Sequence, residues 1–305
     1  MSKSNGFYVW TPNGSASRGP VTSGPVSAPS TTPGLVSRSE PTFQQWSPPA
    51  TRQAPELSQE TRKLAQIGTQ APRIPWDEFR KTVFHWKAGE HMSLIGPTGL
   101  GKTTMLVNVL PMHPFVSVFA TKPRDKTMSG LIRDSGYVRF ERWPNGLDPV
   151  QYPRRVIWPD ASKLDSHTTQ KVVFQDAFAR IYREGGWTLA LDETWYVDDI
   201  LGLGKEIKTY LLQARSLDIS LVSAFQRPAF VPRELYTSST HLMFWRTNDE
   251  TDLKSLGGIG FRSAQLIREV VSDLDMYQVL YINTRTGHML RTRCPEVRMN
   301  TRKGG

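Results

Sequence analysis

Cysteine and long apolar runs are nearly missing from this chain of 305 residues. The single cysteine, Cys294, excludes an internal disulfide and is typical of a reducing compartment. No apolar run reaches the 18 or so residues of a membrane span, and the N-terminus lacks the apolar segment of a signal peptide. Histidine and cysteine show no metal-binding spacing. We therefore expect a soluble cytoplasmic protein in which Cys294 is a free structural thiol.

Large apolar side chains are scarce in the first quarter of the sequence. Residues 1–75 hold 11 of the 22 prolines and are rich in serine and glycine, without apolar periodicity. Such a composition cannot bury enough surface to offset the entropy lost on ordering. We expect a disordered leader over residues 1–72, one folded domain over residues 73–295 and a basic tail over residues 296–305.

The net charge of +10 is concentrated at the two ends. Residues 1–75 carry seven Lys and Arg against three Glu, and residues 285–305 carry six against one. The middle of the chain is nearly neutral. Basic flanks suit contact with a polyanion such as nucleic acid, and they suit solubilising tails equally well.

Short apolar segments alternate with segments of helical spacing from about residue 75 onward. We expect strands at residues 91–96, 115–123, 154–158, 187–193, 219–225 and 240–246, helices at 102–110, 169–184 and 204–217, and a hairpin at 275–293 that turns at Arg285–Gly287. Residues 121–150 are rich in turn formers and stay unassigned. The alternation predicts an α/β fold with a doubly wound, mainly parallel sheet.

The segment Gly96–Thr103, GPTGLGKT, matches the phosphate-binding pattern G-x-x-x-x-G-K-[ST] between an expected strand and an expected helix. Glycines permit a tight loop whose backbone N–H groups point at an anion, and the helix adds the partial positive charge of its N-terminus. We expect Lys102 to reach the β- and γ-phosphates of ATP and Thr103 to give its hydroxyl to Mg²⁺. The expected nucleotide-binding residues are Gly96, Pro97, Thr98, Gly99, Leu100, Gly101, Lys102, Thr103 and Thr104.

Two carboxylates, Asp192 and Glu193, follow the apolar strand Leu189–Leu191. In a P-loop enzyme an acid at this position orders the water shell of Mg²⁺, a role that we assign to Asp192. Glu193 points differently and is expected to polarise the attacking water as the general base. A kinase-like phosphotransferase has a hydroxyl acceptor and does not need this base. The pair therefore favours an ATP-hydrolysing enzyme.

The apolar strand at residues 219–225 ends in Gln226, Arg227 and Pro228. In P-loop ATPases of the additional-strand, catalytic-glutamate type, this strand lies between the acidic strand and the P-loop strand, so its tip faces the γ-phosphate. The Gln226 amide both donates and accepts hydrogen bonds, which suits a sensor of the γ-phosphate or the attacking water. Arg227 either contacts nucleotide or anchors the loop, and Pro228 ends the strand.

At this point the sequence resembles the FtsK–HerA-type DNA-pumping ATPases. The segment Ala214–Pro228 is similar to a family segment in which an arginine-bearing helix leads into a strand ending in TQRP, although Phe225 stands where threonine is usual. The segments GEHMSLIGPTGLGKTT, ATKPRD, LALDE and STHLMFWRTNDETDLKSLGG are similar to further family elements in the same order. The resemblance covers roughly residues 85–295.

The resemblance implies a ring, usually a hexamer, that threads double-stranded DNA through a central channel. ATP then lies between subunits, and an arginine of the neighbouring subunit stabilises the transferred phosphate. Arg215 is the favoured candidate because it precedes the sensor strand, and Arg246 and Arg233 are alternatives. The short build resembles viral genome-packaging ATPases and conjugative pumps more than a membrane-anchored translocase. A viral gene would place the protein in the host cytoplasm.

DNA contacts are expected on channel loops that grip phosphates without reading bases. The alternative for these loops is that they are solvated and contact no DNA. The candidate side chains are Lys122, Arg124, Lys126, Lys205 and Lys208. Trp195 and Tyr196 suit core packing better than an interface. The alternative function is a P-loop ATPase that drives assembly or secretion of a morphogenesis complex without moving DNA.

Overall fold

The computed structural model describes residues 71–163, 165–256 and 264–295. The expected leader over residues 1–72 and tail over residues 296–305 lie almost wholly outside the described residues, so these boundaries stay predictions. Within the described ranges, no helix has both the length and the apolar character needed to cross a membrane.

One nine-stranded sheet runs through the domain in the order β3-β4-β2-β5-β6-β1-β7-β8-β9. From β3 to β7 in this order neighbouring strands are parallel, and the β8–β9 hairpin adds antiparallel strands at one edge. The strands are β1 Met92–Ile95, β2 Val116–Phe119, β3 Val138–Phe140, β4 Arg154–Ile157, β5 Thr188–Leu191, β6 Ser220–Phe225, β7 His241–Trp245, β8 Gln278–Asn283 and β9 Met289–Arg293. The mainly parallel α/β sheet and the hairpin are confirmed.

The position of β6 decides the class of P-loop fold. It pairs in parallel with β5 on one side and with β1 on the other, so the strand that follows the acidic strand lies beside the P-loop strand. This is the additional-strand arrangement that the sequence predicts. The C-terminal ends of β5, β6 and β1 therefore meet at one edge of the sheet.

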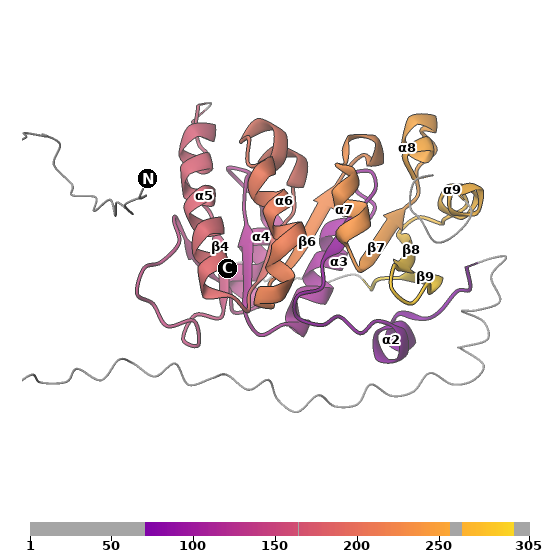
Figure 1. The fold of residues 1–305 in the computed structure, drawn as a ribbon, viewed down its shortest axis with the longest axis horizontal. Coiled ribbons are helices and arrows are strands. Elements are labelled where there is room, and N and C mark those ends of the chain that lie inside the picture. Colours follow the sequence, from indigo (N-terminus) through magenta and orange to yellow (C-terminus); the bar gives the residue numbers. More distant parts are fainter. Residues whose placement is uncertain (1–70, 164, 257–263, 296–305) are drawn as a thin grey trace, which may run out of the picture. The chain divides into compact units, whose positions relative to one another are not determined.

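Helices cover both faces of the sheet, with α5, α6 and α7 on one side and α3 and α4 on the other (Figure 1). The helical elements are α2 Trp76–Glu78, η1 Phe79–Val83, α3 Lys102–Val109, η2 Leu110–Met112, α4 Lys126–Asp134, α5 His167–Glu184, η3 Tyr196–Ile200, α6 Gly204–Gln213, η4 Ala214–Leu217, η5 Pro228–Phe230, α7 Arg233–Ser238, α8 Glu250–Ser255 and α9 Ala264–Ser272.

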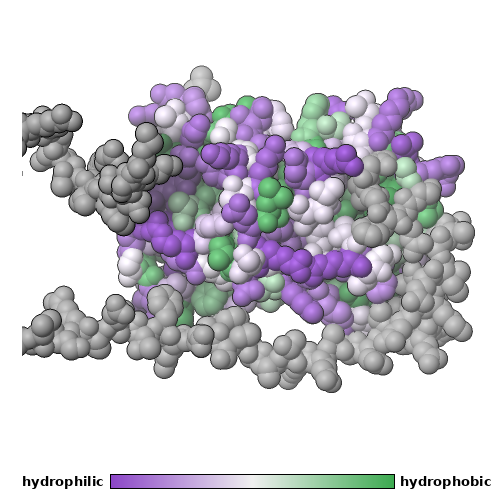
Figure 2. Space-filling view, in the orientation of Figure 1, coloured by the Kyte–Doolittle hydropathy of each residue, from purple (hydrophilic) through white to green (hydrophobic). Residues whose placement is uncertain are grey.

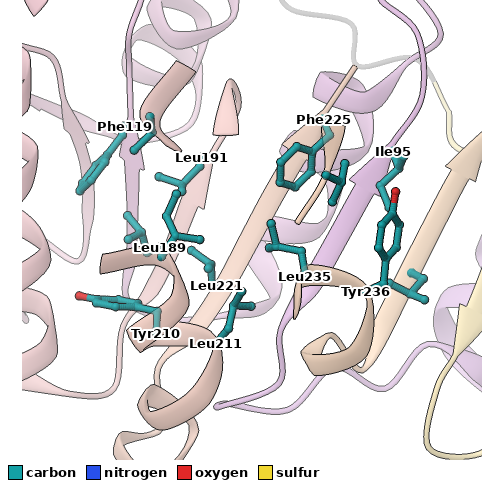
Figure 3. Close-up of a cluster of buried hydrophobic side chains, with 14 of the residues drawn as sticks. Ile95, Phe119, Leu189, Leu191, Tyr210, Leu211, Leu221, Phe225, Leu235 and Tyr236 are labelled. Carbon is teal, nitrogen blue, oxygen red and sulfur yellow. The ribbon is translucent and has the colours of Figure 1, made fainter. Parts of the chain in front are cut away.

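The strands are apolar on both sides because both of their faces are covered. Leu189 and Leu191 of β5 point into the cluster under α5 and α6, whereas Ala190 between them belongs to the cluster under α3 and α4. Figure 3 shows the first cluster, in which Leu221 and Phe225 of β6 lie in the same layer as these leucines. Alternation along each strand thus builds two cores around one sheet.

The outer face over α5, α6 and α7 is largely hydrophilic, with hydrophobic side chains scattered among polar ones (Figure 2).

The turn-rich residues 121–150 contain α4 and β3, two elements that the sequence patterns do not predict. Asp125 is the N-cap of α4, because its Oδ1 accepts hydrogen bonds from the backbone N–H groups of Thr127 (2.8 Å) and Met128 (3.0 Å).

Candidate nucleotide and catalytic site

The loop Gly96–Gly101 leaves the end of β1 and leads directly into α3. Gly96 passes so close to β7 that an added β-carbon would lie 2.6 Å from Cβ of Trp245, which excludes any larger residue. Gly99 and Gly101 adopt left-handed backbone angles of +84° and +102°. The glycine spacing therefore folds the backbone into a cradle at the N-terminus of α3, where N–H groups and the helix dipole favour an anion.

Lys102 lies across this cradle and is only 8% exposed. Its Nζ donates hydrogen bonds to the carbonyl oxygens of Gly96 (2.6 Å) and Pro97 (2.9 Å). Burial lowers the pKa of Lys102 to about 8, against the opposing effect of the carboxylates of Asp192 and Glu193. A desolvated ammonium that is held by two carbonyls is ready to exchange them for phosphate oxygens.

Asp192 extends from the end of β5 toward the start of α3. Thr103 Oγ1 donates a hydrogen bond to Asp192 Oδ1 over 3.1 Å. Burial raises the pKa of Asp192, although the nearby Lys122 opposes this effect. A hydroxyl and a carboxylate side by side fit the hard oxygen ligands of Mg²⁺, so these two residues would hold the ion.

Glu193 is held between side chains from the two strands that flank β5. Lys122, just beyond β2, places Nζ 2.6 Å from Glu193 Oε1. Gln226, just beyond β6, donates from Nε2 to Glu193 Oε2 over 3.1 Å. Burial by itself lowers the pKa of Lys122, but the hydrogen bond and charge of Glu193 outweigh it and the pKa is raised.

Lys122 is the site residue that sequence reasoning missed. The sequence predicts Lys122 only as a DNA contact on a loop, whereas the structure pairs its ammonium with the expected general base. The available signal was its position at the polar end of β2, which neighbours β5 in the sheet. Of the other expected site residues, the structure brings together the P-loop, Asp192, Glu193 and Gln226 but not Arg215.

Arg227 anchors the end of β6 to α8. Its Nη2 lies 2.9 Å from Asp249 Oδ2, and its Nε lies 3.4 Å from Oδ2 of the buried Asp252. Asp252 Oδ1 also accepts a hydrogen bond from the backbone N–H of Ala229 over 3.1 Å. Of the two interpretations of Arg227, these contacts support the loop anchor.

The candidate arginines lie in different places. Arg246 lines a cleft of about 480 Å³ together with Pro97 and Thr98 of its own P-loop. Arg215 belongs to η4, before the start of β6, and β6 spans six residues or roughly 20 Å. Arg215 therefore lies near the N-terminal ends of the strands, whereas its own P-loop lies at their C-terminal ends. Its assignment to the site of a neighbouring subunit stays a prediction, and so does that of the exposed Arg233.

Trp195 corrects one expectation. The prediction that Trp195 packs in the core is wrong, because the residue is 47% exposed. Together with Phe230 it lines an apolar pocket of about 340 Å³ that also contacts Glu193 and Gln226. Tyr196 is half-buried, and its hydroxyl donates to Gln170 Oε1 over 2.8 Å. Trp195 is thus exposed to solvent, whereas Tyr196 packs against the core.

No family model matches the sequence, and no curated protein is similar to it. Among solved structures, the chain is similar to B204, the DNA-packaging ATPase of Sulfolobus turreted icosahedral virus, with a TM-score of 0.52 and 17% identity over 69% of this chain and 100% of that one. The genome packaging NTPase B204 of Sulfolobus turreted icosahedral virus 2, in complex with AMPPCP, gives a TM-score of 0.50 and 17% identity over 66% of this chain and 96% of that one. At this identity the similarity concerns the fold. The described chain has a P-loop ATPase fold and is structurally similar to the FtsK–HerA-type ATPases, as its motifs predict.

Proposed function

We propose that this chain is an ATP-hydrolysing, DNA-translocating motor of FtsK–HerA type that acts in viral genome packaging or DNA transfer. ATP lies between subunits of a ring, a hexamer in this proposal. The observation that carries the proposal is the position of Glu193, which lies between Lys122 and Gln226. A carboxylate at this position can accept the proton of an attacking water molecule, as ATP hydrolysis requires.

Each residue of the site has a distinct role in hydrolysis. The backbone N–H groups of the P-loop and the Lys102 ammonium bind the β- and γ-phosphates. Thr103 and Asp192 would hold Mg²⁺, and the bound ion would supply positive charge beside the phosphates. Glu193 accepts the proton of the attacking water. Gln226 lies beside both the carboxylate and the P-loop cleft, so its amide can respond to the γ-phosphate.

Both oxygens of the Glu193 carboxylate are engaged by protein side chains, Oε1 by Lys122 and Oε2 by Gln226. Each carboxylate oxygen keeps a second lone pair for a water molecule, but the donors of Lys122 and Gln226 stabilise the charged carboxylate and make Glu193 a weaker base. Nucleotide binding that draws the Gln226 amide toward the γ-phosphate would free Oε2. This geometry links the presence of ATP to the basicity of Glu193.

The DNA part of the proposal is supported by charge and by fold. The basic flanks supply most of the net charge of +10, and sequence-independent DNA binding relies on such charge. The DNA-packaging ATPase B204 has a similar fold. DNA in the ring would be held through its phosphates, without readout of bases.

The test is steady-state ATP hydrolysis at low salt with linear duplex DNA of increasing length. We expect stimulation that grows with DNA length, and no hydrolysis from the Lys102→Ala variant. Basal hydrolysis without any stimulation by duplex would refute translocation and favour the assembly or secretion ATPase. An electron micrograph with an ATP analogue and DNA tests the ring directly.

A further inference from the structure

A second cavity, of about 400 Å³, adjoins the P-loop on the side away from the catalytic carboxylate. Its walls include Gly101 and Thr104 at the start of α3, Trp245 at the end of β7, and Tyr277 and Arg293 from the β8–β9 hairpin region. Because β1 lies between β6 and β7, the cavity and the catalytic groups are on opposite sides of the P-loop.

The aromatic side chains of this cavity reach the P-loop itself. A β-carbon added to Gly101 would lie 3.7 Å from Trp245 Nε1 and 3.8 Å from Tyr277 Cδ1. The guanidinium carbon of Arg293 lies 5.6 Å from the centroid of the Tyr277 ring, within the range of a cation–π contact. Two rings and a cation thus converge on the last glycine of the phosphate cradle.

Tyr277 is held in an unusual backbone conformation. Its φ of +64° is left-handed, a region that a bulky side chain rarely occupies. Such a residue costs about 1–3 kcal/mol, and residues of this kind cluster at ligand sites. Tyr277 is also 37% exposed, so part of the residue faces solvent. The conformation places an accessible aromatic face beside the P-loop.

Trp245 supplies a hydrogen-bond donor at the same place. The residue is only 2% exposed and lines the cavity. Across the described ranges of the chain, none of the hydrogen bonds pairs the Trp245 indole N–H with an acceptor. An indole N–H that opens into a cavity can donate a hydrogen bond to a molecule bound there. This donor is therefore available to a ligand in the cavity.

We propose that this cavity binds the nucleoside end of the nucleotide, with a purine base stacked on Tyr277 and the Trp245 indole N–H donating to the nucleoside. The inference rests on the proposed function, which places a nucleotide on the P-loop. The γ-phosphate end lies toward Glu193 and Gln226, so the nucleoside must leave the cradle on the other side. Gly101 and Thr104, which close that side, also line the cavity.

The test compares the binding of ATP with that of inorganic tripolyphosphate, which has no base, by isothermal titration calorimetry. Stacking of one base on an aromatic side chain is worth about 1–3 kcal/mol. We expect Tyr277→Ala to weaken ATP binding about tenfold or more, because 1.4 kcal/mol is a factor of ten. Tripolyphosphate binding should stay unchanged, and Tyr277→Phe should bind ATP like the wild type.

Met276→Ala is the matched control, because Met276 is the neighbouring residue, is 61% exposed, and is not part of the cavity wall. Unchanged tripolyphosphate binding shows that each variant keeps a folded P-loop. If Tyr277→Ala binds ATP as tightly as the wild type, or loses both ligands equally, the nucleoside pocket is refuted while the phosphate site stands. A wild-type protein that binds neither ligand would refute the proposed function itself.

Discussion

Lys102 gives the protein a pH dependence that can be worked out from its surroundings. Burial in the P-loop lowers the pKa of its ammonium to about 8 from the ordinary 10.5. Phosphates require the protonated form, since only the ammonium provides charge and three donors. We therefore predict that the affinity for Mg²⁺–ATP falls when the pH rises from 7 to 9.

The size of the effect follows from the protonated fraction of the free protein. One pH unit above the pKa, about one molecule in ten still carries the proton, and the apparent dissociation constant rises by the inverse of that fraction. The expected weakening between pH 7 and pH 9 is thus about tenfold, or about 1.4 kcal/mol.

The assay is a fluorescence titration with a labelled ATP at constant ionic strength. The Lys102→Arg variant is the control, because a guanidinium keeps its charge throughout this range. Its profile should be flat, even if its affinity is lower at every pH. A flat profile for the wild-type protein would refute the argument that Lys102 is desolvated.

The same lowered pKa affects the nucleotide-free protein in the opposite direction. Between pH 8 and pH 10.5 the unfolded chain still binds the Lys102 proton that the folded chain has released. The contribution of Lys102 to the free energy of unfolding therefore increases as the pH rises through that window. Below pH 8 the lysine is protonated in both states, and the cost of its burial is fully present.

Three substitutions test other parts of the structure. Glu193→Gln should still bind ATP but lose about 10²–10⁴-fold in turnover, the usual contribution of a general base, and single-turnover hydrolysis at the wild-type rate would refute its role. Asp252→Ala should cost about 1–3 kcal/mol of stability in urea unfolding, because the Ala229 N–H loses its buried acceptor; unchanged stability would show that the anchor of the β6 loop lies elsewhere. Leu221→Ala, at a fully buried position of β6, should cost about 2–5 kcal/mol, whereas the exposed Leu212→Ala should change stability by less than about 0.5 kcal/mol; equal effects would contradict the placement of β6.

Residues at the ends of parallel strands were predictable because their positions follow from local patterns. The P-loop motif, the acids after β5 and Gln226 after β6 each follow an apolar run, and parallel strands bring such ends to one edge. The pairing of Lys122 with Glu193 was not predictable in the same way, since it depends on β2 being the neighbour of β5. Sequence alone does not give that strand order.

Two further features depend on tertiary structure. The left-handed backbone of Tyr277 has no sequence signal, because tyrosine is not a residue that marks such turns. The elements α4 and β3 are short and lie among turn formers, where hydrophobic periodicity is too brief to detect. For Tyr277 the packing of the chain overrides a local preference, whereas for α4 and β3 the local signal is too short to detect.

The location of β1 within the sheet has a consequence for motion. β1 is hydrogen-bonded on both sides, and the side chains of β1, β5 and β6 are buried along their whole length. Such strands open only with the global unfolding of a domain, so their amides should exchange with deuterium most slowly. In the proposed function, these strands would stay fixed during ATP turnover. The parts that respond to nucleotide would be the side chains of Lys122, Glu193 and Gln226 at the ends of the strands. Because β1, β5 and β6 would stay rigid, a change at the nucleotide would be transmitted through the side chains beyond the strand ends.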